Sequence, residues 1–236
     1  MKYFIGLILT FYSLSNHAQI PLWEPMSFRM DEQAYSRQMY YDESDTCSYI
    51  YGAFHAVNDT LCNIIKLYPD GTYTLLPPTP HVFTVQAMRY RDKLYVNGDS
   101  GIVRWSGTGW ERIDSAHTMG RMSIYQDKLL ICGTSNSNAF SSLFLWNDTL
   151  LTANFLGVDS LWTNGSGVSV TASYKGQLYI AGNFNDGGGD PDMDELARFD
   201  GTRWRNVGGQ LKGNGLTHIT DMLIWHDSLY VSGQFN

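Results

Sequence analysis

The chain has 236 residues, of which 43% are hydrophobic, 14% aromatic and only 17% charged. That content is enough for a substantial core and excludes a disordered chain. The formal net charge of −7 offers no basic field to attract phosphates, which argues against nucleic acid and anionic membrane surfaces as partners.

The N-terminal segment 1–19 has the pattern of a secretory signal peptide. Lys2 precedes an apolar run from Tyr3 to Leu14, and a polar stretch containing the small residue Ala18 follows. The run is about twelve residues, short of the roughly twenty that a membrane-spanning helix needs. We therefore predict a secreted protein, extracellular or held at the cell surface, with no membrane span after the signal is removed.

A glycine that closes an apolar strand pattern recurs through the rest of the chain. Each copy has Tyr or Leu three places earlier, and a predicted strand and tight turn precede it. A second predicted hairpin follows each of the first four copies. The recurring glycines are Gly52, Gly98, Gly133, Gly182 and Gly233.

The clearest copy of the repeat covers residues 168–208. Lys175-Gly176 and Asp200-Gly201 stand at its breaks, where such pairs tolerate the positive φ angles of tight turns. Two successive hairpins give four antiparallel strands. The repeats divide the chain into units at 33–80, 81–115, 116–161 and 162–213, with a partial unit at 214–236.

Aromatic residues recur in the second hairpin of the units. Trp105-Ser-Gly-Thr-Gly-Trp110 matches Phe199-Asp-Gly-Thr-Arg-Trp204 place for place, and Trp146 opens a similar copy. We expect these rings to fill the space between neighbouring sheets. The prediction is an all-β fold over 20–236, a β-propeller with about four and a half four-stranded blades.

The partial unit predicts an incomplete C-terminus. It has only two strands, and an open sheet edge favours aggregation. Leu22–Met26 resembles an outermost strand that would join the last unit from the N-terminal side, but a third strand would still be lacking. We expect the natural chain to continue beyond Asn236 and supply the remaining blades.

The pattern Leu-Tyr-x-x-Gly-x-Phe, followed by Ala-Arg-Phe-x-Gly-Thr-x-Trp, resembles the kelch-like, galactose-oxidase-type propeller repeats of secreted bacterial proteins. Many of those resemble cargo of type IX secretion. The chain departs from true kelch repeats because its glycines stand single rather than doubled. Galactose oxidase holds copper with tyrosines and histidines, but Tyr95, Tyr179 and Tyr230 recur in the repeat and are typical of packing, so no copper ligand is assigned.

The loop from Asn183 to Glu195 carries the densest set of hard oxygen ligands. Carboxylates at alternate positions suit Ca²⁺, although the loop does not meet the helical calcium-loop template. A solvated acidic loop is the alternative. The candidate ligands are Asp186, Asp190, Asp192, Asp194 and Glu195.

Other chemistry-bearing residues form no recognisable catalytic set. The histidines lack zinc-site spacing, and Asp200-Gly-Thr-Arg-Trp204 lacks one residue of the sialidase Asp-box. Cys132 lies inside a predicted strand and is expected to be a buried apolar residue. A bridge between Cys47 and Cys62 requires an unusual strand register.

These observations predict a secreted, non-catalytic propeller that acts as a binding, adhesion or scaffold module. Its expected partner is a glycan or a surface protein, with no cofactor other than calcium at the acidic loop. The alternative is a fragment of a carbohydrate-active or copper-dependent oxidase of the galactose-oxidase type, whose catalytic residues lie outside this chain.

Overall fold

The computed structural model confirms that the described part of the chain is all-β and contains four-stranded antiparallel sheets. No α-helix occurs in the part of the chain that the structure describes, and hence none there is long and apolar enough to cross a membrane. The described residues are 27–31, 37–114, 117–135, 141–152, 156–157, 167–184, 190–208 and 218–234.

Four sheets follow one another along the chain, and each pairs its strands in sequence order. The first sheet is β1 (Arg37–Asp42), β2 (Cys47–Gly52), β5 (Ile64–Leu67) and β6 (Tyr73–Leu75). The second is β7 (Thr84–Tyr90), β8 (Lys93–Gly98), β9 (Gly101–Trp105) and β10 (Trp110–Asp114).

The third sheet is β11 (His117–Tyr125), β12 (Lys128–Ser135), β13 (Ser141–Trp146) and β14 (Leu151–Thr152). The fourth is β15 (Gly167–Tyr174), β16 (Gln177–Asn183), β17 (Leu196–Phe199) and β18 (Trp204–Asn206). A single parallel bridge, Ser141 to Gly167, joins these two sheets. The final hairpin is β19 (His218–Trp225) and β20 (Ser228–Gln234).

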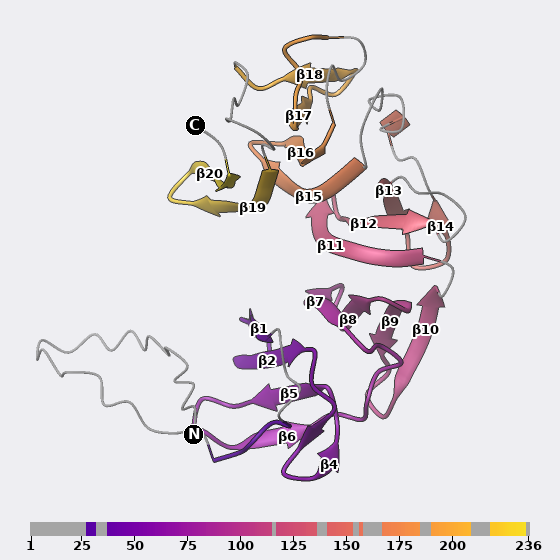
Figure 1. The fold of residues 1–236 in the computed structure, drawn as a ribbon, viewed down its shortest axis with the longest axis vertical. Coiled ribbons are helices and arrows are strands. Elements are labelled where there is room, and N and C mark those ends of the chain that lie inside the picture. Colours follow the sequence, from indigo (N-terminus) through magenta and orange to yellow (C-terminus); the bar gives the residue numbers. More distant parts are fainter. Residues whose placement is uncertain are drawn as a thin grey trace, which may run out of the picture.

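The sheets are arranged around an open arc. Figure 1 shows the first strand of each sheet on the inner side and the fourth strand on the outer side. The first strands contact one another in chain order, so that β7 lies against β1 and β11, and β15 lies against β11 and β19. Each sheet therefore packs face to face with the next.

Hydrophobic clusters fill the spaces between consecutive sheets. Tyr49 and Val96 belong to the cluster between the first and second sheets, and Tyr95 and Ile131 to the next. Further clusters lie between the third and fourth sheets and between the fourth sheet and the final hairpin. The core is thus a series of layers between sheets, because every sheet has two apolar faces to bury.

Two of the recurring glycines, Gly98 and Gly182, lie very close to a backbone carbonyl group of their own sheet. A Cβ on Gly182 would lie 2.0 Å from the carbonyl oxygen of Gly167, and one on Gly98 would lie 2.1 Å from that of Phe83. No side chain fits at such distances. The recurring glycines pair with the first strand of their own sheet. In the second, third and fourth sheets and in the final hairpin, a β-bulge or register shift follows the partner: Thr84, Met119, Val168 and Ile219.

Tryptophans of the third or fourth strand connect the second, third and fourth sheets to preceding parts of the chain. The indole Nε1 of Trp110 donates to the carbonyl of Pro77 at 2.7 Å, and that of Trp204 to the carbonyl of Leu156 at 3.1 Å. Trp146 donates to the hydroxyl of Tyr95 at 3.2 Å. Burying an indole requires a partner for its N–H, and these contacts provide it.

One element was not predicted from the sequence. The short hairpin of β3 (Ala56–Val57) and β4 (Thr60–Leu61) lies between β2 and β5, and Met30 forms an isolated bridge with Val57. Phe28, Met30 and Val57 pack on the face of the first sheet that is turned away from the second. The hairpin therefore covers a face that would otherwise be exposed.

Candidate functional site

The sheets have two distinct ends. The turns between first and second strands contact their neighbours from sheet to sheet: Tyr90 donates to the carbonyl of Asp127 at 3.0 Å, and Tyr174 to that of Asp227 at 2.7 Å. We call this side the turn end. The recurring glycines close the second strands on the opposite side, the glycine end, from which the loops to the third strands depart.

The turn end holds an ionic cluster between the first and second sheets. Arg89 of β7 donates from Nε to Asp42 at 2.6 Å and from Nη2 to Asp45 at 2.8 Å. Lys66 of β5 lies 2.9 Å from Asp45, and the hydroxyl of Tyr49 donates to the same carboxylate at 3.2 Å. These contacts connect two sheets through charge-assisted hydrogen bonds.

Electrostatics keep these carboxylates ionised. Burial alone would raise the pKa of Asp42, but hydrogen bonds from Ser44 and Arg89 outweigh it and leave the pKa lowered. The hydrogen bond from Lys66 is the main cause of the lowered pKa of Asp45. Burial raises the pKa of the neighbouring Tyr49 hydroxyl, so it remains a neutral donor.

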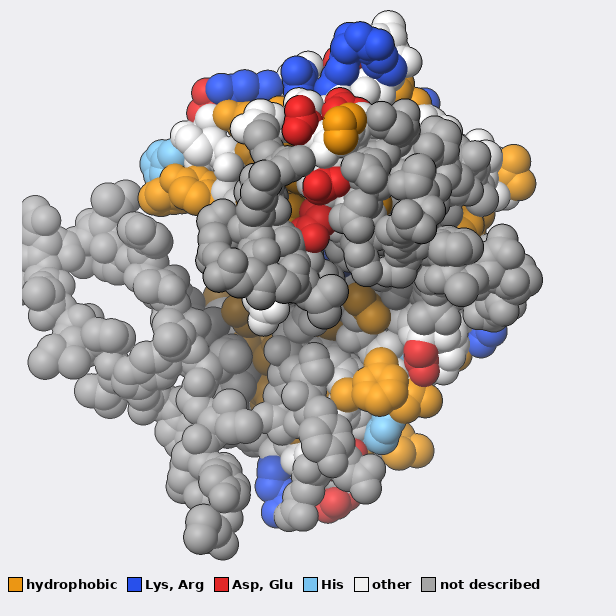
Figure 2. All heavy atoms as spheres, turned by 45° about the horizontal axis from the view of Figure 1, so that its top comes forward, with side chains coloured by type: hydrophobic (Ala, Val, Ile, Leu, Met, Phe, Trp, Pro, Cys, Tyr) orange, Lys and Arg blue, Asp and Glu red, His pale blue; other side chains and the backbone are white. Residues whose placement is uncertain are grey.

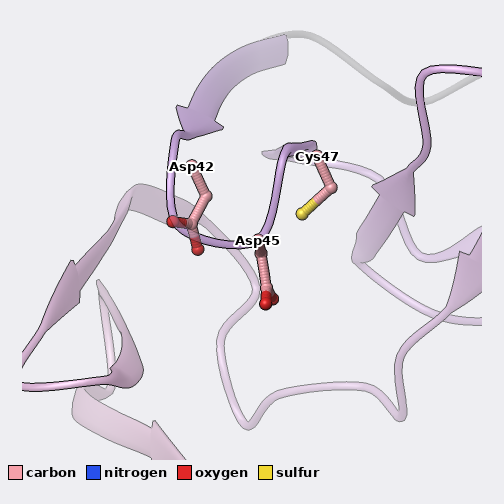
Figure 3. Close-up of side chains that lie close together, drawn as sticks. All are labelled: Asp42, Asp45 and Cys47. Carbon is pink, nitrogen blue, oxygen red and sulfur yellow. The ribbon is translucent and has the colours of Figure 1, made fainter.

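Asp42, Asp45 and Cys47 form the one group in the described part of the chain whose geometry would suit a metal ion (Figure 3). One ligand atom from each lies within 4.8 Å of the others. Two cationic side chains already bind the carboxylates, and burial raises the pKa of the Cys47 thiol, which disfavours the thiolate that metals bind. We interpret the group as a structural ion-pair cluster.

The predicted calcium loop lies at the glycine end, between β16 and β17. Asp190 closes a turn by accepting the backbone N–H of Asp192 at 3.0 Å, and Met193 inserts into the core between the third and fourth sheets. Glu195 is buried and has a φ of 60°. Asp186 lies outside the described residues, so calcium binding at this loop stays a prediction.

The described acidic residues of this loop are not gathered into a ligand cage. Apart from the cluster at Asp42, no three acidic, histidine or cysteine groups of the described residues meet within 4.8 Å. Asp192 is exposed, whereas Glu195 is 7% exposed and lies against β16, where its carbonyl accepts the N–H of Gly182 at 3.0 Å. These residues fix the path of the loop.

The Asp-Gly-Thr motif of the second hairpins is a turn motif. Asp200 accepts the backbone N–H of Thr202 at 2.9 Å and its hydroxyl at 2.7 Å, and Asp70 binds Thr72 in the same way. Hydrogen bonds from Arg205 and Thr202 lower the pKa of Asp200 to about 2. The Asp200 carboxylate therefore accepts the hydrogen bonds that close the turn. This turn role accounts for the resemblance to an Asp-box.

A buried histidine joins the first sheet to the second. The backbone of His81 donates to Thr79 at 3.3 Å, and its carbonyl accepts from Asn63 at 3.0 Å. Its Nδ1 accepts the N–H of Ser100 at 3.3 Å. Burial lowers the pKa of His81 although the Asp99 carboxylate lies 3.7 Å away, so the ring is neutral near pH 7.

Polar side chains of the first strands bind one another along the inner side of the arc. Arg121 of β11 lies 3.3 Å from Asp221 of β19, although β15 separates these strands in chain order. The hydroxyls of Ser123 and Thr171 share a hydrogen bond. These contacts hold the first strands together and produce no nucleophile with an adjacent base.

The three cysteines are free and buried. Cys47 packs between the first two sheets, whereas Cys62 packs on the other face of the first sheet. Burial raises the pKa of Cys62 to about 11 and that of Cys132 to about 12, which keeps these thiols protonated. None of the three has the environment of a reactive cysteine.

Among the described residues that are visible in Figure 2, no single kind of side chain forms a dominant patch. Basic side chains gather along the upper edge of this view, and the visible hydrophobic side chains form separate groups. Four large apolar side chains of the final hairpin are exposed: Leu223, Ile224, Trp225 and Tyr230.

Sequence reasoning missed the cluster at Asp42 because its partners are far apart in the chain. Arg89 stands 47 positions after Asp42, and no local spacing links them. The only sequence feature that could have indicated the cluster is a pair of opposite charges: the turn before Cys47 is acidic, and the tip of the next predicted hairpin is basic.

Comparison with known proteins found no match: neither a model of any known family nor any curated protein resembles the chain detectably.

Proposed function

We propose that this protein is a secreted, non-catalytic β-propeller that binds a glycan or a surface protein through loops at the glycine end. Support for the propeller comes from the four sheets around an arc, with their first strands on the inner side (Figure 1). Support for secretion comes from the signal-peptide pattern of 1–19.

The proposed binding role rests on a contrast between the repeated residues, which are structural, and the loops, which differ between the units. The repeated residues have packing or turn roles. Gly182 lies against the backbone of Gly167, the Trp204 indole donates to the carbonyl of Leu156, and Asp200 closes a turn. The loops at the glycine end differ from unit to unit. They range from Asp99-Ser100 to the acidic segment before Leu196. A constant frame with variable loops is typical of binding proteins.

The test is a binding assay of the full chain against an array of glycans and bacterial cell-wall fragments. We expect saturable binding to at least one ligand and no release of reducing sugar. Repeating the assay with EDTA tests the calcium prediction, because chelation would abolish binding that depends on a loop-bound ion.

A matched pair of variants locates the binding surface. Asp192→Asn alters the glycine end and should weaken binding, whereas Asp92→Asn alters an exposed turn at the other end and should leave it unchanged. Turnover of any sugar without binding, or stoichiometric copper in the purified protein, would contradict the proposal and favour the oxidase alternative.

A further inference from the structure

The backbone of His81 is fixed by contacts with the first sheet. The residue lies in the segment between β6 and β7, which crosses the glycine end from the first sheet to the second. Its N–H donates to Thr79 Oγ1 at 3.3 Å, and its carbonyl accepts the Asn63 side-chain amide at 3.0 Å. A Cβ on Gly98 would lie 2.9 Å from the ring, and the exposed fraction of the side chain is 0%. The ring therefore packs tightly between its own fixed backbone and the end of β8.

The imidazole of His81 faces the half-buried junction between β8 and β9. Its Nδ1 accepts the backbone N–H of Ser100 at 3.3 Å, which requires that Nδ1 carries no proton. The Asp99 carboxylate lies 3.7 Å from the same atom, too far for a hydrogen bond. In the described part of the chain, Asp99 and Arg112 of β10 are the charged groups that act on the ring, whereas Asn63, on the side of the first sheet, is neutral. The neutral ring thus binds the junction through Ser100 alone.

Asp99 also holds the loop formed by Val82 and Phe83. Its Oδ1 accepts the N–H of Val82 at 3.1 Å and that of Phe83 at 3.3 Å, and its own N–H donates to the carbonyl of Phe83 at 3.3 Å. Val82 is 50% exposed and Phe83 is 52% exposed, so this loop carries two large apolar side chains at the surface. One carboxylate therefore lies between a titratable ring and an exposed apolar loop.

Protonation of the ring reverses the role of Nδ1. Both nitrogens of an imidazolium are donors, so Nδ1–H and the Ser100 N–H would face each other as two donors, and the hydrogen bond between them is lost. A charge-assisted hydrogen bond with Asp99 then becomes the favourable contact, and at 3.7 Å a small movement is enough to form it. Because the backbone of His81 is fixed, the junction of Asp99 and Ser100 is the part that moves.

We propose that His81 is an acid-sensitive switch that reshapes the glycine end between the first and second sheets. With a neutral ring, Ser100 binds Nδ1, and Asp99 binds the loop of Val82 and Phe83. With a protonated ring, Asp99 binds Nδ1, the Ser100 N–H is released, and the loop follows the Asp99 carboxylate. Burial is the largest influence on the pKa of His81 and lowers it, so the change occurs below about pH 6.5, the usual value for histidine. The switch does not depend on which ligand the glycine end binds.

NMR of the isotope-labelled full chain from about pH 7.5 to about pH 5 tests the proposal. The ring signals of His81 report its protonation, and we expect the amide signals of Ser100 and Phe83 to shift with the same midpoint. After correction for the intrinsic pH dependence of exchange, the protection of the Ser100 amide should fall about two- to tenfold, because one hydrogen bond is lost. Amides in the middle of β8 should keep their protection.

Three variants separate the switch from a general effect of acid. His81→Gln retains an acceptor but cannot be protonated, so the Ser100 amide should no longer respond to pH. Asp99→Asn retains an acceptor for the N–H groups of the loop but removes the negative charge, so the midpoint of His81 should move to lower pH. His55→Gln, at an exposed position of the same end, should leave the response unchanged. Asp99→Asn tests the proposal even where His81→Gln does not fold.

Three results would overturn the proposal. The first is a Ser100 amide that stays constant while the ring of His81 takes up its proton, and the second is a ring that remains neutral down to about pH 5. The third is a simultaneous loss of the amide signals of all the sheets, which would show that protonation unfolds the chain instead of moving one junction.

Discussion

Gln86 and Met122 lie on the first strands of neighbouring sheets and exchange two hydrogen bonds. Gln86 Nε2 donates to the carbonyl of Met122 at 3.1 Å, and Gln86 Oε1 accepts the N–H of Met122 at 2.5 Å. A single side chain thereby pairs with the backbone of another sheet. It does so just beyond the bulge or register shift of each strand, where regular pairing is interrupted.

The variant Gln86→Ala should lower the free energy of unfolding by about 1–3 kcal/mol, because it leaves the N–H and C=O of Met122 without this partner. Urea unfolding followed by fluorescence measures the effect. Gln234→Ala removes an exposed glutamine and should change stability by less than about 0.5 kcal/mol. Equal effects of the two variants would contradict the role of the contact between the sheets.

Gly182→Ala should destabilise the protein by at least about 2 kcal/mol, because its methyl group would lie 2.0 Å from a carbonyl oxygen. Gly109→Ala is the matched control, since a Cβ there meets no atom within 4 Å. Thermal unfolding of both variants is the measurement. A tolerated Gly182→Ala would show that the first and second strands separate easily at the bulge.

Trp204→Ala should lower the free energy of unfolding by about 3–5 kcal/mol, because it opens a cavity between the third and fourth sheets. The indole is 8% exposed and also loses its hydrogen bond to Leu156. Trp225 is 59% exposed, so Trp225→Ala should change stability little. Denaturant midpoints compare the two, and similar midpoints would contradict a packing role for Trp204.

Arg89→Met should lower the free energy of unfolding by about 2–3 kcal/mol, because the Asp42 side chain, only 2% exposed, loses its cation. This is less than for a fully interior pair, since exposed Ser44 and Asp45 flank the carboxylate. The double variant with Asp42→Asn should be more stable than Arg89→Met alone. Lys175→Met, at an exposed ion pair with Asp227, is the control and should have little effect.

Because His81 is buried and neutral, we expect the folded protein to lose stability below about pH 6.5, the usual pKa of histidine in an unfolded chain. Its folded pKa is lowered, chiefly by burial and slightly by Arg112, against the opposing effects of Asp99 and the Val96 backbone. The unfolded chain therefore binds a proton first. The stability contributed by neutral His81 is complete above that pH and is lost as the pH falls toward the folded pKa.

Urea unfolding from pH 8 to pH 5 measures this dependence. The variant His81→Phe, which keeps a ring but cannot be protonated, should flatten the slope between about pH 6.5 and 5. His226→Gln, at an exposed turn, should keep the slope of the original protein. An unchanged slope in His81→Phe would assign the pH dependence to other groups.

The local parts of the fold were predictable because their causes lie within a few residues. Alternating residues around Lys175-Gly176 predict a hairpin, and Asp200 and Thr202 close the next turn through their own side chains. The β3–β4 hairpin was missed because its strands are very short and Asn58 and Asp59 adopt positive φ without a glycine.

Contacts between sheets were not predictable from spacing. Arg89 binds Asp42, and Gln86 binds Met122, through sheet packing that joins residues in different repeats. The sequence indicated these contacts only through residue type, since a basic residue stands at one hairpin tip and an acidic residue at another. Calcium binding at the acidic loop stays a prediction, because its candidate ligand Asp186 lies outside the described residues.

The junction between second and third strands tolerates very different lengths on an unchanged frame. Two residues, Asp99 and Ser100, form this junction in the second sheet, whereas the first sheet has a whole extra hairpin in the same place. The strands beyond the junction still pair in the same register, with Lys66 opposite Tyr49 and Arg104 opposite Tyr95. Foreign peptides grafted between Asp99 and Ser100 would therefore be displayed without disturbing the strands, which makes the second repeat a natural host for engineered loops.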